Sequence, residues 1–424
     1  MKESQPPADV IIARSRILPY ALLLLCCLLI ITTTIDFSFP LLIRKSRTLT
    51  DFDGFYIVGK MFWNGSLASA YNFESMLRAQ LQITGAQSFL PGPWTYPPQF
   101  SLIVVALATL PEGLSYFIFT TLTFLSYSLV LRALAKEYFG VVILAITPAL
   151  FITIKCGQNG FLTGTLVGLF CLAFIRDRLR AGLPLGFMVI KPHLAVGMAV
   201  LALVNRRWGV LLISALVVGL TSLLTTMVFG YHIWPPFIGG IRESAQFFKN
   251  GFYPFFRMTS VYAVCMTLGM PSGAALLIQS TVALAACWSI YYGCSKGWSQ
   301  KHMAGIAALA SLLVSPYNYD YDLPIFGIAL ALLIPEIIAG TSPLEKAGLL
   351  GCSWVACGWG FLQNCLHHKS QPLSALDLHD KAYSVAGIFL LVIFFKVLKV
   401  VAAAEGSAEN LKKQAKNCQN TKRD

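Results

Sequence analysis

The chain has 424 residues, of which 56% are hydrophobic and only 12% carry a charged side chain. Soluble globular proteins carry about 25% charged residues, so this chain has too little polar surface to coat a water-soluble body. The composition excludes an ordinary soluble enzyme and indicates an integral membrane protein built from apolar helices.

The formal net charge of +13 would suggest nucleic-acid binding in a soluble protein. Here the basic residues stand in short clusters between apolar runs, at Arg14 and Arg16 and at residues 176–180, 206–207 and 412–423. Such clusters are typical of cytoplasmic loops, which carry an excess of Lys and Arg. We therefore expect a lipid bilayer, and no nucleic acid, as a partner.

The apolar segments are predicted to form helices. They cover residues 17–35, 99–112, 114–135, 139–154, 159–175, 182–204, 208–230, 272–292, 301–315, 322–339, 346–364 and 381–402. The first is long enough to cross a bilayer, and no small-residue cleavage site follows it, so we expect an uncleaved span and not a signal peptide. The predicted fold class is all-α, a polytopic transmembrane protein with about 10–12 membrane helices, some of them short or broken.

The segment 182–204 differs from the other predicted spans, because Pro192 interrupts it and basic residues flank it at both ends. One straight crossing would put the two basic clusters on opposite faces of the membrane. A broken, re-entrant pair of half-helices places both clusters on one face, and such breaks are tolerated where they line a cavity. The sequence therefore predicts a re-entrant pair here.

Residues 1–404 are predicted to form one membrane domain, followed at 405–424 by a polar, Lys-rich, disordered cytoplasmic tail. Two long stretches lie outside the membrane, at 36–98 and 231–257. With a cytoplasmic N-terminus the first is an external loop with an interfacial helix over 52–63, although the basic cluster at 44–47 opposes this orientation. None of the 11 cysteines has zinc-ligand spacing with His, so we expect no disulfide and no metal site.

Ionisable side chains at membrane depth are costly and usually mark function. Asp51 and Asp53 follow the first span, where a carboxylate can serve as a general base or simply cap the interfacial helix. Lys191 lies in the middle of the broken segment, too far from either end to reach the interface easily. It can hold an anionic group or pair with one of the few acids. The Tyr/Asp stretch at 315–324 can bind a polyol or a cation, or cap the next helix.

Taken in order, these segments resemble glycosyltransferase family 87, the multi-span enzymes that use polyprenyl-phosphate sugars and include mycobacterial α-1,2-mannosyltransferases. The similar stretches cover roughly residues 50–335. They are the Asp-Phe-x-x-Phe-Tyr segment with its continuation at 51–71, Tyr-Pro-Pro at 96–98, Gly-Gln-Asn-Gly at 157–160, the Lys-Pro-His region at 181–208, and the Tyr/Asp stretch at 315–323. One departure is Asn72, where the family more often has Asp.

The resemblance implies a GT-C fold and a hexosyltransferase, with mannose as the family's best-known sugar. It implies inverting transfer from a polyprenyl-phosphate sugar donor to a glycolipid or glycan acceptor. The protein would be a multi-pass protein of the bacterial inner (plasma) membrane, with its active site facing the periplasm. The alternative function is that of a secondary transporter or lipid flippase, against which the absence of an internal repeat argues.

The resemblance also implies roles for single residues. Asp51 would be the general base, with Asp53 as the second candidate. Lys191, His193 and Arg257 would bind the donor phosphate. The residues expected to bind the sugar or the acceptor are Tyr56, Tyr96, Gln158, Asn159, Tyr317 and Asp322. No cofactor is expected, because the lipid-linked sugar is a substrate, and no divalent metal site is evident.

Overall fold

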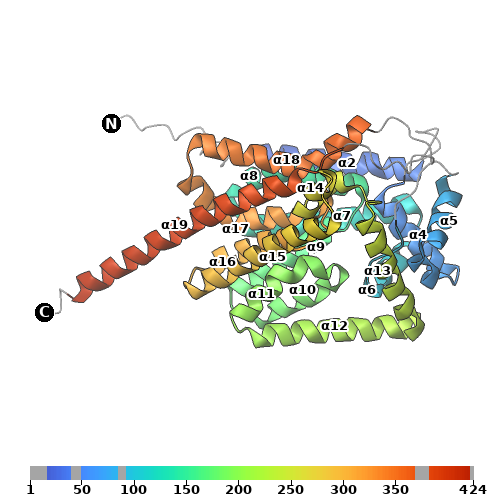
Figure 1. Cartoon of the computed structure of the whole chain (residues 1–424), viewed down its shortest axis with the longest axis horizontal. Coiled ribbons are helices and arrows are strands. Elements are labelled where there is room, and N and C mark those ends of the chain that lie inside the picture. The colour runs from blue at the N-terminus through green and yellow to red at the C-terminus, as the bar shows by residue number, and fades with distance from the viewer. Residues whose placement is uncertain (1–16, 40–48, 85–91, 368–381, 421–424) are drawn as a thin grey trace.

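A computed structural model describes residues 17–39, 49–84, 92–367 and 382–420 and shows an all-α membrane protein (Figure 1). These residues contain no strand, and a single isolated antiparallel bridge joins Met258 to Tyr319. The predicted all-α class is confirmed. The basic clusters at Arg14 and Arg16 and at 44–47 lie outside the described residues.

The bundle is built from long helices that match the predicted apolar segments. They are α2 (Ile17–Ser38), α7 (Glu112–Ala135), α8 (Phe139–Cys156), α9 (Gly160–Ile175), α12 (Trp208–Phe229), α15 (Ser272–Ser295), α16 (Gln300–Val314), α17 (Pro324–Gly340), α18 (Pro343–His367) and α19 (Ala386–Asn420). Within the described ranges, five helical segments are long and apolar enough to cross a membrane, namely Ile17–Ser38, Glu112–Cys156, Trp208–Phe229, Ser272–Ser295 and Ala386–Leu411.

The core lies around α16 and α17, in which almost every side chain is buried. By contrast α12, at the edge of the bundle in Figure 1, exposes apolar side chains along one face. Leu212, Leu216 and Leu220 of that helix, spaced four residues apart, are 62%, 55% and 65% exposed. Exposed apolar area on this scale marks an interaction surface, and on a span-length helix it indicates contact with lipid.

The segment 182–204 is broken, as predicted. Its parts are α10 (Gly182–Phe187), the 3-10 turns η4 (Met188–Ile190) and η5 (Pro192–Ala195), and α11 (Val196–Val204). Lys191 stands at the break with φ −144° and ψ 72°, because Pro192 disfavours helical geometry in the residue before it. The two ends of the segment lie close together. Arg207, which follows α11, forms an ion pair with Asp177, which precedes α10, and lies over the ring of Phe174. The predicted break is therefore confirmed, with Lys191 at its tip, and re-entry into the membrane stays a prediction.

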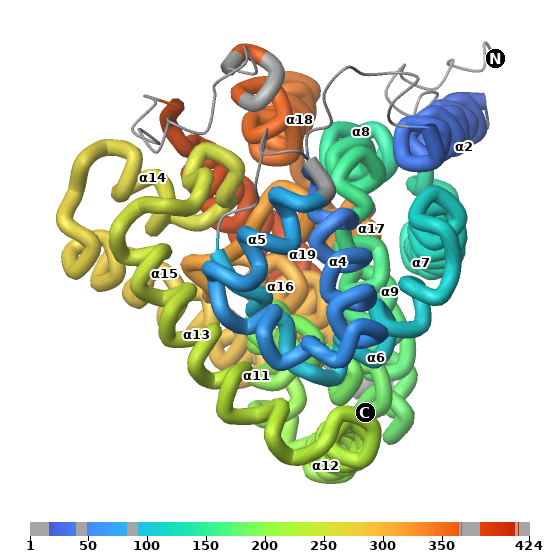
Figure 2. The backbone as a smooth tube through the Cα atoms, turned by 90° about the vertical axis from the view of Figure 1, so that its right-hand side faces the viewer, coloured from blue at the N-terminus to red at the C-terminus, as the bar shows by residue number. Residues whose placement is uncertain are grey.

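Shorter elements gather at one end of the bundle, the end that faces the viewer in Figure 2. They are α4 (Asp51–Trp63), η1 (Leu67–Tyr71), α5 (Phe73–Thr84), α6 (Pro98–Leu107), α13 (Trp234–Lys249), η7 (Phe255–Arg257), α14 (Val261–Thr267) and η8 (Asp320–Asp322). The predicted helix over 52–63 is present as α4. These elements, together with the break at Lys191, frame the site described below.

The predicted disordered tail is wrong over residues 405–420, because α19 continues to Asn420. Residues 401–420 are rich in Ala, Lys, Glu and Gln, which are strong helix formers, and Gly406 is the poorest helix former among them. The continuation is also tied down at its start. The carboxylate of Glu405 accepts a hydrogen bond of 2.7 Å from the backbone N–H of Ser299 before α16.

The close packing of α11 on α16 leads to a prediction about the stability of a Gly197 variant. A Cβ added at Gly197 would lie 2.1 Å from the carbonyl oxygen of Ala307, which is backbone and cannot swing away. We expect Gly197→Ala to lower the free energy of unfolding in detergent by about 1–3 kcal/mol. Gly219→Ala is the matched control, because Gly219 on α12 has no atom within 4 Å of an added Cβ. Equal thermal stability of the two variants would contradict the close contact.

Candidate active site

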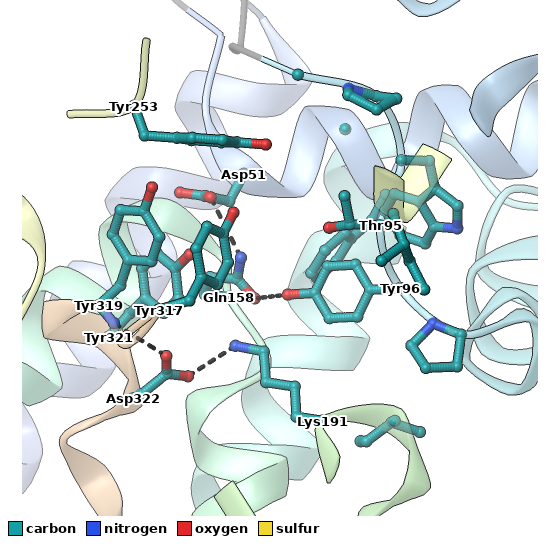
Figure 3. Close-up of a pocket in the computed structure, with 18 of the residues that line it drawn as sticks. Asp51, Thr95, Tyr96, Gln158, Lys191, Tyr253, Tyr317, Tyr319, Tyr321 and Asp322 are labelled. Carbon is teal, nitrogen blue, oxygen red and sulfur yellow. Dashed lines mark hydrogen bonds and ion pairs between the residues drawn. The ribbon is translucent and has the colours of Figure 1, made fainter. Parts of the chain in front are cut away.

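A cavity of about 370 Å³ lies where α4, the loop before α6, the break at Lys191 and the loop between α16 and α17 meet. Its lining comes from segments that are far apart in sequence (Figure 3). Of the residues predicted from sequence, the structure brings eight to this cavity: Asp51, Tyr96, Gln158, Lys191, His193, Arg257, Tyr317 and Asp322.

A chain of hydrogen bonds holds Asp51, the first residue of α4. The side-chain amide of Gln158 donates to Asp51 Oδ1 at 3.2 Å, and its oxygen accepts from the Tyr96 hydroxyl at 2.9 Å. Burial raises the pKa of Tyr96 to about 12, so this hydroxyl remains a donor at neutral pH. Because both ends of the Gln158 amide are engaged, its orientation and that of Asp51 are fixed.

Gly157 explains how Gln158 reaches Asp51. It ends α8 in the left-handed conformation, with φ +62°, which favours glycine. A Cβ there would lie 2.6 Å from the Cβ of Phe52 on α4. Only glycine allows the turn between α8 and α9 to approach α4 so closely.

Lys191 and Asp322 form a buried ion pair in the wall of the cavity. Lys191 Nζ lies 2.7 Å from Asp322 Oδ1, and the two side chains are 7% and 2% exposed. The other oxygen, Oδ2, accepts from the backbone N–H of Tyr319 at 3.1 Å and closes the turn at η8. An ammonium group has three donors, of which Asp322 takes one, so Lys191 can still offer a donor to a ligand.

Arg257 lies between two carboxylates. Its Nη2 and Nε lie 3.0 and 3.3 Å from the two oxygens of Asp320, and its Nη1 lies 3.8 Å from Asp51 Oδ2. Asp320 is 1% exposed. Burial raises the pKa of the Asp320 carboxyl, and the adjacent guanidinium opposes that rise.

Aromatic rings form much of the remaining wall, and sequence reasoning did not assign most of them to the site. Tyr319 and Tyr321 stack with ring centroids 5.1 Å apart, and Trp94 and Tyr253 also face the cavity. The sequence offers a signal for Tyr319 and Tyr321, because both continue the two-residue spacing of tyrosines that begins at Tyr317. No local motif marks Tyr253.

The structure keeps three predicted residues away from the cavity. Asp53 is buried and caps α4, accepting from the backbone N–H and the hydroxyl of Thr50 at 2.6 and 2.9 Å. The hydroxyl of Tyr56 donates to the carbonyl of Leu110 at 3.0 Å. Asn159 is fully buried at the start of α9 and does not line the cavity. The cap hypothesis thus fits Asp53, and Asp51 is the acid that faces the cavity.

His193 follows the helix break and lines the cavity beside Lys191. Its Nε2 is buried and has no hydrogen-bond partner among the described residues. Burial of an unpaired ring nitrogen costs free energy.

Comparison of the sequence with models of known families gives a match to the description "Glycosyltransferase family 87" over residues 94–316, just over half of the chain. The matched stretch contains Tyr96, Gln158, Lys191, His193 and Arg257. No curated protein and no solved structure gives a significant match. With this match, the helical bundle and its apolar spans, the chain belongs to glycosyltransferase family 87 and is a membrane glycosyltransferase.

Proposed function

We propose that this enzyme transfers a hexose, with mannose as the first candidate, from a polyprenyl-phosphate donor to a glycolipid or glycan acceptor. The reaction inverts the anomeric carbon, and Asp51 is the general base. The observation that carries the proposal is the placement of a carboxylate, Asp51, and a cation, Lys191, in one cavity on two sides of Gln158 (Figure 3). Displacement of a phosphate by a hydroxyl needs a group of each kind.

Lys191 and His193 lie where they could stabilise the negative charge that develops on the leaving phosphate. As the bond between the anomeric carbon and the phosphate oxygen breaks, its electron pair passes to the phosphate. That group needs charge stabilisation more than a proton, and fixed donors in a site shielded from water are effective. The ammonium of Lys191 can supply such a donor, and His193 lies beside it in the cavity wall.

Asp51 is suited to accept the proton of the attacking hydroxyl. As the acceptor oxygen bonds to the anomeric carbon, its proton passes to the carboxylate of Asp51. Inversion requires the base and the leaving group to lie on opposite faces of the sugar. In Figure 3 Gln158 lies between the side chains of Asp51 and Lys191, and Tyr96 and the tyrosines at 317–321 flank them on two sides. Tyr96, Gln158, Tyr317 and Asp322 would hydrogen-bond the sugars, and tyrosine rings would stack on them.

The chain path supports an extracytoplasmic site. The ends of α8 and α16 beside the cavity are Cys156 and Val314, and α9 starts there at Gly160. Their other ends meet loops rich in Lys and Arg, which are Lys136, Arg176, Arg178, Arg180, Lys296 and Lys301. By the positive-inside rule those loops are cytoplasmic, so the cavity opens to the periplasm of a bacterial inner membrane.

Cysteine labelling tests this orientation. Asn64, after α4, and Arg178, after α9, are both exposed and lie at opposite ends of the bundle. A membrane-impermeant maleimide should label Asn64→Cys in intact cells and Arg178→Cys only after permeabilisation. The wild-type chain gives the background from its native cysteines. The reverse pattern would place the cavity in the cytoplasm.

A donor comparison tests the proposed function. Membranes containing the chain are supplied with a radiolabelled hexose as either the polyprenyl-phosphate or the nucleotide sugar, together with a membrane lipid and glycan extract. We expect transfer from the polyprenyl-phosphate sugar, and none from the nucleotide sugar when synthesis of the lipid-linked sugar is blocked. Direct use of the nucleotide sugar would contradict the proposal.

A further inference from the structure

The contacts of Arg257 leave little of its guanidinium for a substrate. Nε and Nη2 both donate to Asp320, and Nη2 also lies 3.3 Å from the sulfur of Cys156. Nη1 is directed at Asp51. A forked, charge-assisted pair of this kind is strong and fixes the geometry of both partners. The N–H groups that remain for a donor phosphate are those of Nη1, which already face Asp51.

Packing also holds this pair in place. The guanidinium lies over the rings of Tyr319 and Tyr321, with 5.8 and 5.4 Å to the ring centroids. On the other side, a Cβ at Gly360 of α18 would lie 2.4 Å from Asp320 Oδ2 and 3.0 Å from the Cα of Arg257. Backbone and rings thus enclose the pair, so Arg257 has no room to follow a moving ligand.

We infer that Arg257 is a positioning residue for the base, held by Asp320 so that its charge faces Asp51, and is not a ligand of the donor phosphate. This inference rests on the proposed function, in which Asp51 accepts the proton. It replaces the phosphate-binding role that the resemblance implied for Arg257, and it leaves the phosphate to Lys191 and His193.

The division of the guanidinium between two acids has a chemical consequence. A forked pair with Asp51 would occupy the carboxylate oxygens that have to reach the acceptor hydroxyl. Asp320 takes the fork instead and leaves Asp51 at 3.8 Å. At that distance the cation orients Asp51 without covering both of its oxygens.

Two variants test this through the split between kcat and KM. Asp320→Asn removes the fork that holds Arg257. The double variant Arg257→Gln with Asp320→Asn removes both charges and leaves no buried charge unpaired. In both variants we expect kcat to fall about tenfold or more, because the base is no longer oriented, with the donor KM within about twofold of wild type.

Lys155→Gln is the control, because Lys155 pairs with Asp36 at 3.5 Å, is partly exposed and does not line the cavity. It should keep the wild-type kcat and donor KM. A donor KM raised tenfold in the double variant, with kcat unchanged, would make Arg257 a phosphate ligand and overturn the inference. Failure of the wild-type chain to transfer sugar would contradict the proposed function itself, and the inference with it.

Discussion

Replacing Asp51 with Asn is expected to lower kcat for sugar transfer by about 10²–10⁴-fold, the usual contribution of a general base. The amide cannot accept the proton of the acceptor hydroxyl, yet it has the shape of the carboxylate and can still accept the hydrogen bond from Gln158. The chain should therefore fold and bind donor with an unchanged affinity. Initial rates and donor binding, measured on the same purified preparation, check both parts.

Asp53→Asn is the matched control, two residues along the same helix. Asp53 caps α4 through Thr50 and is buried away from the cavity. We expect this variant to lose about 1 kcal/mol of stability and to keep its turnover. Loss of transfer in Asp53→Asn together with full transfer in Asp51→Asn would move the base to Asp53. Full transfer in both variants would contradict the carboxylate mechanism.

Replacing Lys191 is the second substitution with a large expected effect. Lys191→Met leaves Asp322 buried without its cation, which should destabilise the chain by about 3–5 kcal/mol. Poor folding would then hide any catalytic effect. The double variant Lys191→Met with Asp322→Asn removes both charges, and the new amide can still accept from the backbone N–H of Tyr319.

The double variant should recover most of the thermal stability, because no unpaired charge remains buried. Transfer should nevertheless fall about 10²–10³-fold, the usual cost of losing one donor that stabilises developing charge. Thermal unfolding in detergent and the rate of transfer measure the two effects separately. Wild-type rates in the double variant would mean that Lys191 serves only as the partner of Asp322.

The sequence predicts the bundle well because each apolar run is long and is ended by polar residues or proline. The broken segment is also predictable, since Pro192 and the basic flanks on both sides allow few other arrangements. The sequence does not reveal the helix over residues 405–420, because low hydrophobicity and many Lys residues are typical of disorder. The high helix propensity of these residues and the hydrogen bond between Glu405 and Ser299 favour the helix over a disordered chain.

The site is only partly predictable. Asp51 and Asp53 are two residues apart, about 200° around a helix, so only one can face the cavity, and the sequence does not say which. The partner of Lys191 is 131 residues away, and no local pattern links it to Asp322. Tyr253 likewise reaches the cavity through the tertiary fold alone. Pairings of this kind depend on how helices pack, which a single sequence does not specify.

Photo-crosslinking tests most directly whether this cavity holds a lipid-linked sugar. A polyprenyl-phosphate sugar with a photoreactive group on the sugar is bound to the purified chain and irradiated, and the labelled sites are mapped by mass spectrometry. We expect labelled peptides from residues 92–97 and 317–322, and loss of the label when unlabelled donor competes. Labelling confined to the lipid-facing surfaces of α12 and α15, unchanged by competing donor, would contradict this expectation.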